Sequence, residues 1–366
     1  MIKNKTIAVV VPAYNEEKQI EMVIETMPDF VDRIVIVNDK SKDKTAEIVK
    51  QAINKDKHNY SNSRIRPLKP ERNRYNEADV LITEMAEREK VYFTSHEIFN
   101  ETSDSDRIIL INHLDNGGVG AAIATGYKWC KDMQIDCTAV MAGDGQMDPS
   151  ELESICMPVV DESVDYVKGN RLIHQSARNV MPKRRFFGNS VLSILTKIAS
   201  GYWRVSDTQT GYTAISLEAL NSIELYKIYP KYGMPNDMLV KLNIVSCTVR
   251  EIPIKPVYRI GEQSKMKIRK VIPKISYLLL RSFFKRLWQK YLIKSFHPLF
   301  LLYIIAFLLF IVSIPFAVKI INYAIFLRIS VNPVTVLAFI FLFISSFQSL
   351  LFAMWMDIQD NERLYK

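Results

Sequence analysis

The chain has 366 residues, of which 48% are hydrophobic and only 12 are glycine and 15 proline, a composition that excludes collagen-like and disordered proteins. Its net charge is +9, yet ten basic residues and no acidic one lie between Ser264 and His297, so the remainder carries 9 − 10 = −1. Nucleic-acid-binding proteins usually spread basic residues over a folded face, so this local cluster beside an apolar segment predicts contact with anionic lipid and no nucleic-acid partner.

Apolar runs alternate with helical patterns through the first half of the chain. The runs are residues 5–11, 33–37, 108–112 and 137–141, and the helical patterns are 16–27, 45–52 and 121–131. This alternation predicts an α/β fold with a mostly parallel sheet covered by helices. Ligands of such sheets bind beyond the carboxyl ends of the strands, where Asp39, Asn116 and Asp144 lie. Ser41 or Asp43 is expected to cap the helix at 45–52.

Residues 54–106 interrupt this alternation, and they are polar and charged, with one helical stretch at 76–90. Compact βα units usually have short connections, so this segment is predicted to be an insertion or subdomain. The first apolar run is too short for a signal peptide and is soon followed by Glu16 and Glu17, so the first domain is expected in the cytoplasm.

The last third of the chain predicts membrane attachment. Residues 269–294 mix basic with apolar side chains, as in a helix that lies on the cytoplasmic leaflet. Uncharged runs at 299–318 and 333–356 are each long enough to cross about 30 Å of hydrocarbon. Because the connection between them holds only Lys319 and Arg328, the positive-inside rule places both termini in the cytoplasm of a multi-pass protein of the cytoplasmic membrane.

Three groups of residues are candidates for the chemistry. Asp144 and Gln146 end a predicted strand and supply the oxygen ligands that Mg²⁺ or Mn²⁺ prefers; a simple turn is the alternative, and Asp39 on a neighbouring strand end favours the metal. Gly118 and Gly120 precede a helix and would allow close approach of a phosphate, although the dinucleotide and phosphate-loop patterns are absent. Arg171, residues 183–185 and the segment 261–267 supply cations near the membrane side, where they could hold a phosphate; a solvated run of surface charges is the alternative.

Several motifs occur along the chain in a fixed order. They are Pro12-Ala-Tyr14-Asn-Glu16, Val37-Asn-Asp39, Asn116-x-Gly118-x-Gly120, Gly143-Asp-Gly-Gln-Met-Asp-Pro149, Gly169-Asn-Arg171, Ser206-Asp-Thr-Gln-Thr-Gly-Tyr212, Glu251-Ile-Pro-Ile254 and Arg259-x-Gly261-x-x-Ser264-Lys265. As a set they resemble glycosyltransferase family 2, in the branch of dolichol-phosphate mannose synthases and bacterial polyisoprenyl-phosphate glycosyltransferases. The resemblance covers about residues 5–53 and 107–295, and the two-helix tail is typical of the bacterial members.

The resemblance implies a GT-A fold, a Rossmann-like and mostly parallel sheet, and a nucleotide-diphosphate sugar donor. It also implies roles for individual residues: Pro12, Tyr14, Glu16 and Asp39 around the base and ribose, Asp144 and Gln146 at the metal, Arg171, Arg185 and Lys265 at the donor and acceptor phosphates, and Asp207 beside the reacting groups. In one departure, Ala142-Gly143 replaces the Asp-Ala of many relatives, which removes one carboxylate from the neighbourhood of the metal; the insertion at 54–106 is a second departure.

The implied reaction transfers a hexosyl or N-acetylhexosaminyl group, with UDP favoured over GDP in the donor, to polyprenyl phosphate with inversion. The expected organisation is a catalytic domain at 1–260, an interfacial segment at 261–297, two transmembrane helices within 298–356 and a cytoplasmic tail at 357–366. A processive polysaccharide synthase is an alternative, but its QxxRW motif is absent. A non-catalytic membrane module that binds nucleotide sugars is another alternative. The sequence is also compatible with a homo-oligomer.

Overall fold

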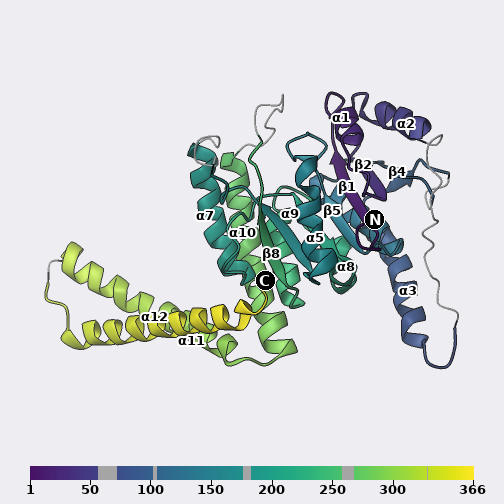
Figure 1. Ribbon diagram of the computed structural model, residues 1–366. Helices are drawn as coiled ribbons and strands as arrows, with labels where there is room; N and C mark the ends of the chain where they lie inside the picture. Colours follow the sequence, from purple (N-terminus) through teal and green to yellow (C-terminus); the bar gives the residue numbers. More distant parts are fainter. Residues whose placement is uncertain (57–71, 102–104, 176–182, 258–267, 328) are drawn as a thin grey trace.

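The computed structural model describes residues 1–56, 72–101, 105–175, 183–257, 268–327 and 329–366. Within them, a sheet with helices on both faces is followed by two long helices that project from the domain side by side (Figure 1). The predicted α/β organisation with a C-terminal helical hairpin is confirmed.

Eight strands of the described residues form a sheet in the order β3-β4-β2-β1-β5-β7-β6-β8. β3 and β7 run antiparallel to their neighbours, and the others run parallel to one another. We call the side on which the parallel strands end the carboxyl edge. The strands are β1 (Ile7–Ala13), β2 (Arg33–Asn38), β3 (His96–Ile98), β4 (Ile108–His113), β5 (Cys137–Val140), β6 (Tyr166–Asn170), β7 (Thr213–Ser216) and β8 (Val249–Pro253).

Apolar side chains alternate between the two faces of the sheet, because successive residues of a strand point in opposite directions. In β1, Ala8 and Val10 join one core with α4, α8 and α9, whereas Val9 and Val11 join the other core with α1, α2 and α5. The helices of this domain are α1 (Ile20–Glu25), α2 (Thr45–Asp56), α3 (Glu77–Glu89), α4 (Val119–Asp132), α5 (Leu152–Asp161), α7 (Lys183–Ser200), α8 (Leu217–Ser222) and α9 (Met234–Ile244), with short 3-10 turns η1 (Lys90–Tyr92), η2 (Pro149–Glu151) and η3 (Leu225–Lys227).

The predicted insertion is partly integrated into the domain. Helix α3 forms where a helix was expected, and β3 pairs with β4 and extends the sheet by one edge strand. None of the residues of α3 is buried. The insertion therefore contributes the edge strand β3 to the sheet, whereas its helix α3 buries no residue against the domain.

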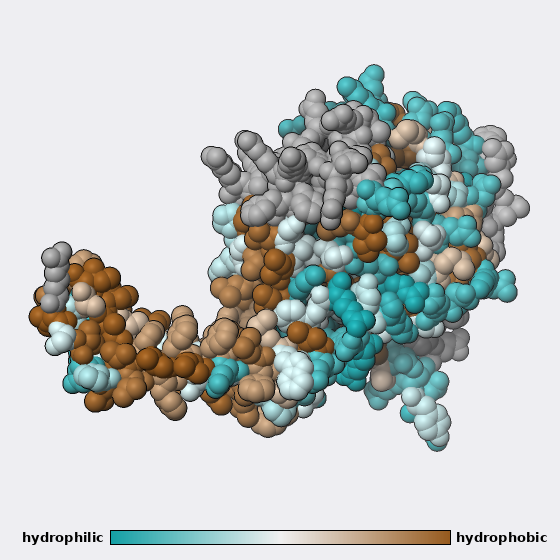
Figure 2. Space-filling model, turned by 60° about the vertical axis from the view of Figure 1, so that its left-hand side comes forward, coloured by the Kyte–Doolittle hydropathy of each residue, from teal (hydrophilic) through white to brown (hydrophobic). Residues whose placement is uncertain are grey.

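The interfacial segment and the hairpin follow β8. The interfacial segment consists of α10 (Ile268–Arg286) and the π-helical η4 (Leu287–Lys294), and the hairpin consists of α11 (Pro298–Ile321), η5 (Asn322–Leu327) and α12 (Pro333–Glu362). Both hairpin arms are long and apolar enough to cross a membrane, and only 22% and 11% of the residues in their most apolar stretches are buried. Figure 2 shows the resulting apolar surface of the projecting helices. A core helix of a soluble protein would instead be mostly buried.

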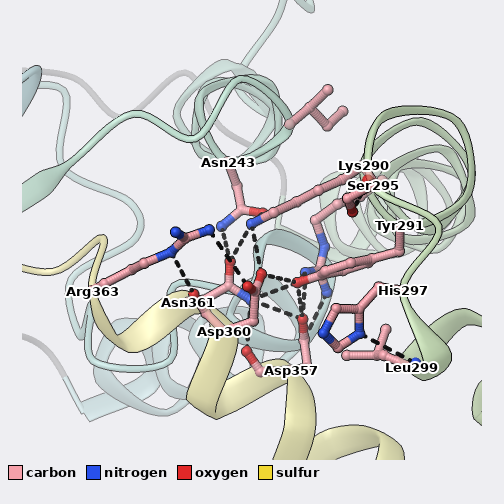
Figure 3. Close-up of polar contacts among 12 residues, drawn as sticks. Asn243, Lys290, Tyr291, Ser295, His297, Leu299, Asp357, Asp360, Asn361 and Arg363 are labelled. Carbon is pink, nitrogen blue, oxygen red and sulfur yellow. Dashed lines mark hydrogen bonds and ion pairs between the residues drawn. The ribbon is translucent and has the colours of Figure 1, made fainter.

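A cluster of buried polar side chains joins the end of α12 to the α/β domain (Figure 3). Arg286 and Asp357 have no solvent exposure and form two hydrogen bonds of 2.7 and 2.8 Å. Tyr291 donates to Asp357 at 2.7 Å, and Lys290 donates to Asn361 at 2.6 Å. We call these residues, together with Asn243 of α9, the anchor cluster; Asn243 donates to Asn361 at 2.7 Å.

The anchor cluster corrects the prediction that the basic residues of the interfacial segment all face lipid. Arg286 is fully buried and also donates to the backbone oxygens of Ala199 and Ile198 at the end of α7. Lys290 is 5% exposed, and burial lowers its pKa to about 8. Lys285, by contrast, is exposed. Arg286 and Lys290 therefore bind partners inside the protein, because charged groups on a helix can face either lipid or the protein interior.

The predicted cytoplasmic tail is also part of the folded domain. Helix α12 continues to Glu362, and the last residues then run parallel to the edge strand β8. The backbone N–H of Val249 donates to the oxygen of Leu364 at 2.7 Å, and that of Lys366 donates back to Val249 at 3.0 Å. Leu364 is buried in the core. Both ends of the hairpin therefore lie on the same side, next to the α/β domain.

Candidate active site

The loops that follow β1 and β2 are joined to each other at the carboxyl edge. The N–H of Asn15, which has a φ of 57°, donates to Ser41 Oγ at 3.0 Å, and the N–H of Glu16 donates to Thr45 Oγ1 at 2.9 Å. Asp43 accepts from the N–H of Thr45 at 3.1 Å, so Asp43 rather than Ser41 caps α2. Pro12 is buried, and Tyr14 and Glu16 are half-buried beside this junction. Their contact with a nucleotide stays a prediction.

Asp39 organises the next loop of this edge. It is 3% exposed, and its carboxylate accepts the N–H groups of Gly117 and Gly118, each at 2.8 Å, and Nδ1 of His113 at 2.8 Å. Burial alone would raise the pKa of Asp39, but the hydrogen bonds from His113 and the two glycines hold that pKa below its usual value. Asp39 therefore stays ionised and connects the ends of β2 and β4.

The structure shows a packing requirement for the two candidate glycines. A Cβ atom on Gly118, whose φ is +91°, would lie 2.5 Å from the oxygen of Pro230, and one on Gly120 would lie 2.1 Å from the oxygen of Tyr229. The N–H of Gly120 donates to Pro230 at 2.9 Å. These glycines are needed because the backbone before α9 passes directly over them, and a role in phosphate binding stays a prediction.

Asp144 and Gln146 lie together in the turn that follows β5. Asp144 accepts the N–H of Gln146 at 3.0 Å, and Gly145 between them has a φ of +73°. Both side chains are half-buried, and the N–H of Gly143 donates to the oxygen of Pro12 at 3.2 Å, which joins this turn to the loop after β1. A carboxylate and an amide oxygen two residues apart fit a hard divalent cation. In the described part of the chain, no three His, Cys, Asp or Glu side chains gather as a metal cluster.

Arg171 and Asp207 form a bidentate ion pair at the end of β6. Arg171 Nε and Nη2 donate to Asp207 at 2.8 and 3.0 Å, and the Arg171 N–H donates to it at 3.1 Å. Asp207 is 1% exposed. Burial alone would raise the pKa of Asp207, but the Arg171 guanidinium, helped by Lys168, holds it below its usual value. Asp207 thus orients a cation that is itself partly exposed.

Two residues near this pair were given no role from the sequence. Lys168 is fully buried, with a pKa lowered to about 8 by burial, and donates to the oxygen of Thr210 at 2.8 Å. Glu251 is 8% exposed and accepts backbone N–H groups of the loop that carries Asp207. The signal for Lys168 was a lysine that directly follows two apolar residues of a strand, Tyr166 and Val167. The side chain of Arg185, in the first turn of α7, and the whole of Lys265 lie outside the described residues.

The turn after β5 and the loop of Asp207 also meet. Tyr212 donates its hydroxyl to the oxygen of Asp148 at 2.9 Å. Together with the contact between Gly143 and Pro12, this places the turn of Asp144 between the loop after β1 and the loop of Asp207. The predicted residues of the described chain thus line the carboxyl edge in one continuous series of loops.

The chain is similar to known proteins of one family. Residues 8–81 and 94–223 match the family described as "Glycosyl transferase family 2". A protein of Methanococcus voltae named UDP-N-acetylglucosamine–dolichyl-phosphate N-acetylglucosaminyltransferase is 28% identical over 256 residues, which are 70% of this chain and 87% of that protein. A polyprenol monophosphomannose synthase of Mycolicibacterium smegmatis is 26% identical over 184 residues, 48% of this chain and 66% of that protein.

Among solved structures, the chain is similar to glucosyl-3-phosphoglycerate synthase of Mycobacterium tuberculosis, at 14% identity and a TM-score of 0.47 over 77% of this chain and 80% of that one. The family match spans over half of the chain and includes the motifs at the ends of β1, β2, β4, β5 and β6. The protein is a glycosyltransferase with a GT-A fold and belongs to glycosyltransferase family 2.

Proposed function

We propose that this enzyme transfers a sugar from a UDP-sugar to polyprenyl phosphate at the cytoplasmic face of the membrane, with inversion. Relatives named as dolichyl-phosphate and polyprenol-phosphate sugar transferases support a lipid phosphate as the acceptor. The name of the Methanococcus relative makes UDP-N-acetylglucosamine the first donor to test.

The observation that supports the proposal most is the position of α7 between the site and an exposed apolar surface. On its inner side, Ser193 Oγ lies 3.2 Å from Oγ1 of Thr208, the residue next to Asp207. On its outer side, Ile194 is 59% and Val191 41% exposed. Helix α10, beside α7 in Figure 1, exposes further apolar side chains, among them Leu280. A membrane that covered this apolar surface would bring lipid headgroups to the level of the Arg171–Asp207 pair.

The state of the carboxylates supports a phosphate rather than a hydroxyl acceptor. Asp39 and Asp207 are both bound by several donors, and both have a lowered pKa, which makes them weak bases. A sugar hydroxyl would need a general base, whereas a phosphate monoester, with a second pKa of about 6, is already largely dianionic at neutral pH. The acceptor therefore supplies its own nucleophile.

The residues of the carboxyl edge then have distinct tasks. Asp144 and Gln146 would hold Mg²⁺ or Mn²⁺ against the donor diphosphate, where the cation neutralises charge on the leaving group. Arg171, held by Asp207, offers its guanidinium to a phosphate, and Arg185 and Lys265 are proposed to do the same. Positioning two phosphates in line and neutralising them is the main requirement of such a transfer.

The assay that tests the proposal uses the purified full chain in detergent with undecaprenyl phosphate and each of several labelled UDP- and GDP-sugars. A glycolipid with one sugar, with UDP-sugars preferred, is the expected product. A polymer would show a processive synthase instead. Donor binding without product would show a non-catalytic module.

Membrane topology gives a separate prediction. Because both ends of the hairpin pack on the catalytic domain and the basic residues flank it there, residues near Asn322 are expected outside and the end of α12 inside. Asn361 is 3% exposed and part of the anchor cluster, so a probe belongs at the exposed Arg363 instead. An impermeant thiol reagent applied to intact cells should label Asn322→Cys and leave Arg363→Cys unlabelled until the cells are opened. The opposite pattern would refute the orientation.

A further inference from the structure

Two side chains from neighbouring strands hold the loop that carries Asp207. Lys168 of β6 and Glu251 of β8 are partners in the parallel pairing of these strands. Glu251 Oε1 accepts the N–H of Asp207 at 2.9 Å, and its Oε2 accepts the N–H of Ser206 at 2.9 Å and the Ser206 hydroxyl at 3.0 Å. Lys168 donates to the oxygen of Thr210 at 2.8 Å. Side chains of the sheet therefore bind the loop on both sides of Asp207, at Ser206 and at Thr210.

The position of this loop also determines the position of the Arg171 guanidinium. The backbone of Asp207 is placed by Glu251, and the carboxylate of Asp207 accepts three hydrogen bonds from Arg171. A planar guanidinium bound at two nitrogens can turn only if the carboxylate turns with it. A shift of the loop at Ser206 and Asp207 would therefore redirect Arg171.

We propose that Glu251 is a positioning residue of the transferase. By holding the backbone at Asp207, it fixes the direction in which the Arg171 guanidinium faces a bound phosphate. This inference rests on the proposed function, in which Arg171 binds a phosphate. Glutamine is a poor replacement for Glu251, because either orientation of its amide would point NH₂ at a backbone N–H. The site requires two acceptor oxygens at this position, and within the described residues Glu251 supplies both.

A double-mutant cycle on kcat/KM for polyprenyl phosphate tests this relation. Arg171→Lys keeps the charge and removes the bidentate geometry. We expect Glu251→Gln and Arg171→Lys each to lower kcat/KM about ten- to a hundredfold, since each disturbs a hydrogen bond to a charged group. If Glu251 acts through Arg171, the double variant should be less than about threefold worse than Arg171→Lys. If the loss of kcat/KM in the double variant equals the product of the two single losses, the two residues act independently and the proposal is overturned.

The control is Arg250→Gln, the adjacent residue of β8, whose ion pair with Glu162 at 2.6 Å is solvent-exposed. We expect it to leave kcat/KM within about twofold of the unmodified enzyme, because exposed ion pairs contribute little. A loss equal to that of Glu251→Gln would show that any disturbance of β8 has this effect, and the specific role of Glu251 would fall.

Amide hydrogen exchange on the full chain, without donor or acceptor, separates this inference from the proposed function. In Glu251→Gln, peptides covering residues 205–209 and 169–173 should exchange at least about tenfold faster, with β1 unchanged. Unchanged exchange at 169–173 would overturn the positioning role even if the enzyme proves inactive on polyprenyl phosphate. If Glu251→Gln does not fold, Glu251→Asp, which keeps both acceptor oxygens on a side chain shorter by one methylene, is expected to show the same pattern with a smaller change.

Discussion

Asp144→Ala is expected to lower sugar transfer at least about a hundredfold while the protein stays folded and in the membrane. Asp144 lies half-buried in the turn after β5, where its carboxylate and the amide of Gln146 would share a divalent cation. Metal stabilisation of the leaving diphosphate is worth several kcal/mol, and each 1.36 kcal/mol corresponds to a factor of about ten in rate. Initial rates at saturating Mg²⁺ or Mn²⁺ measure the loss.

Asp148→Asn is the matched control, four residues further along the same turn. The Asp148 side chain accepts the N–H of Ser150 at 2.9 Å, and asparagine keeps that acceptor. This variant should retain activity within a few-fold. Full activity of Asp144→Ala, or of the unmodified enzyme in excess chelator, would rule out the metal site.

Asp357→Ala is expected to reduce stability by about 3–5 kcal/mol, because it leaves Arg286 buried and without its carboxylate. Neither side chain has any exposure; Arg286 also donates to the backbone oxygen of Ala199, and Asp357 also accepts from Tyr291. The thermal midpoint in detergent should fall clearly. Replacing both partners, as in Arg286→Met with Asp357→Leu, should restore most of the loss, since no charge then stays unpaired.

The pair Arg204–Glu362 provides the comparison, because it also joins the end of α12 to the catalytic domain. Its side chains are 59% and 55% exposed, so Glu362→Ala should change stability by less than about 1 kcal/mol. Equal effects of Asp357→Ala and Glu362→Ala would show that the anchor cluster adds nothing beyond a surface contact.

Local patterns in the sequence predicted most of the fold. Runs such as residues 33–37 are apolar on both faces, and such strands occur in parallel sheets covered on both sides, as β2 is. The hairpin followed from uncharged length alone. The candidate residues Asp39 and Asp144 were placed correctly at the carboxyl edge, because a polar residue after a buried strand lies where that strand ends. The extent of α2, which runs to Asp56, was not predicted, because polar helix ends have no apolar period.

Only the tertiary structure showed which charged side chains bind partners inside the protein. The sequence by itself determined a glycosyltransferase sheet, the residues at its carboxyl edge and two membrane-length helices. It grouped Arg286 and Lys290 with the lipid-facing cations, whereas their partners Asp357 and Asn361 arrive from about 70 residues further along the chain. It likewise gave no role to Glu251, whose partners Ser206 and Asp207 precede β7 and reach it because β6 pairs with β7 on one side and with β8 on the other. Patterns of hydropathy report on local burial, but the partner of a buried charge depends on which distant segments the fold brings together.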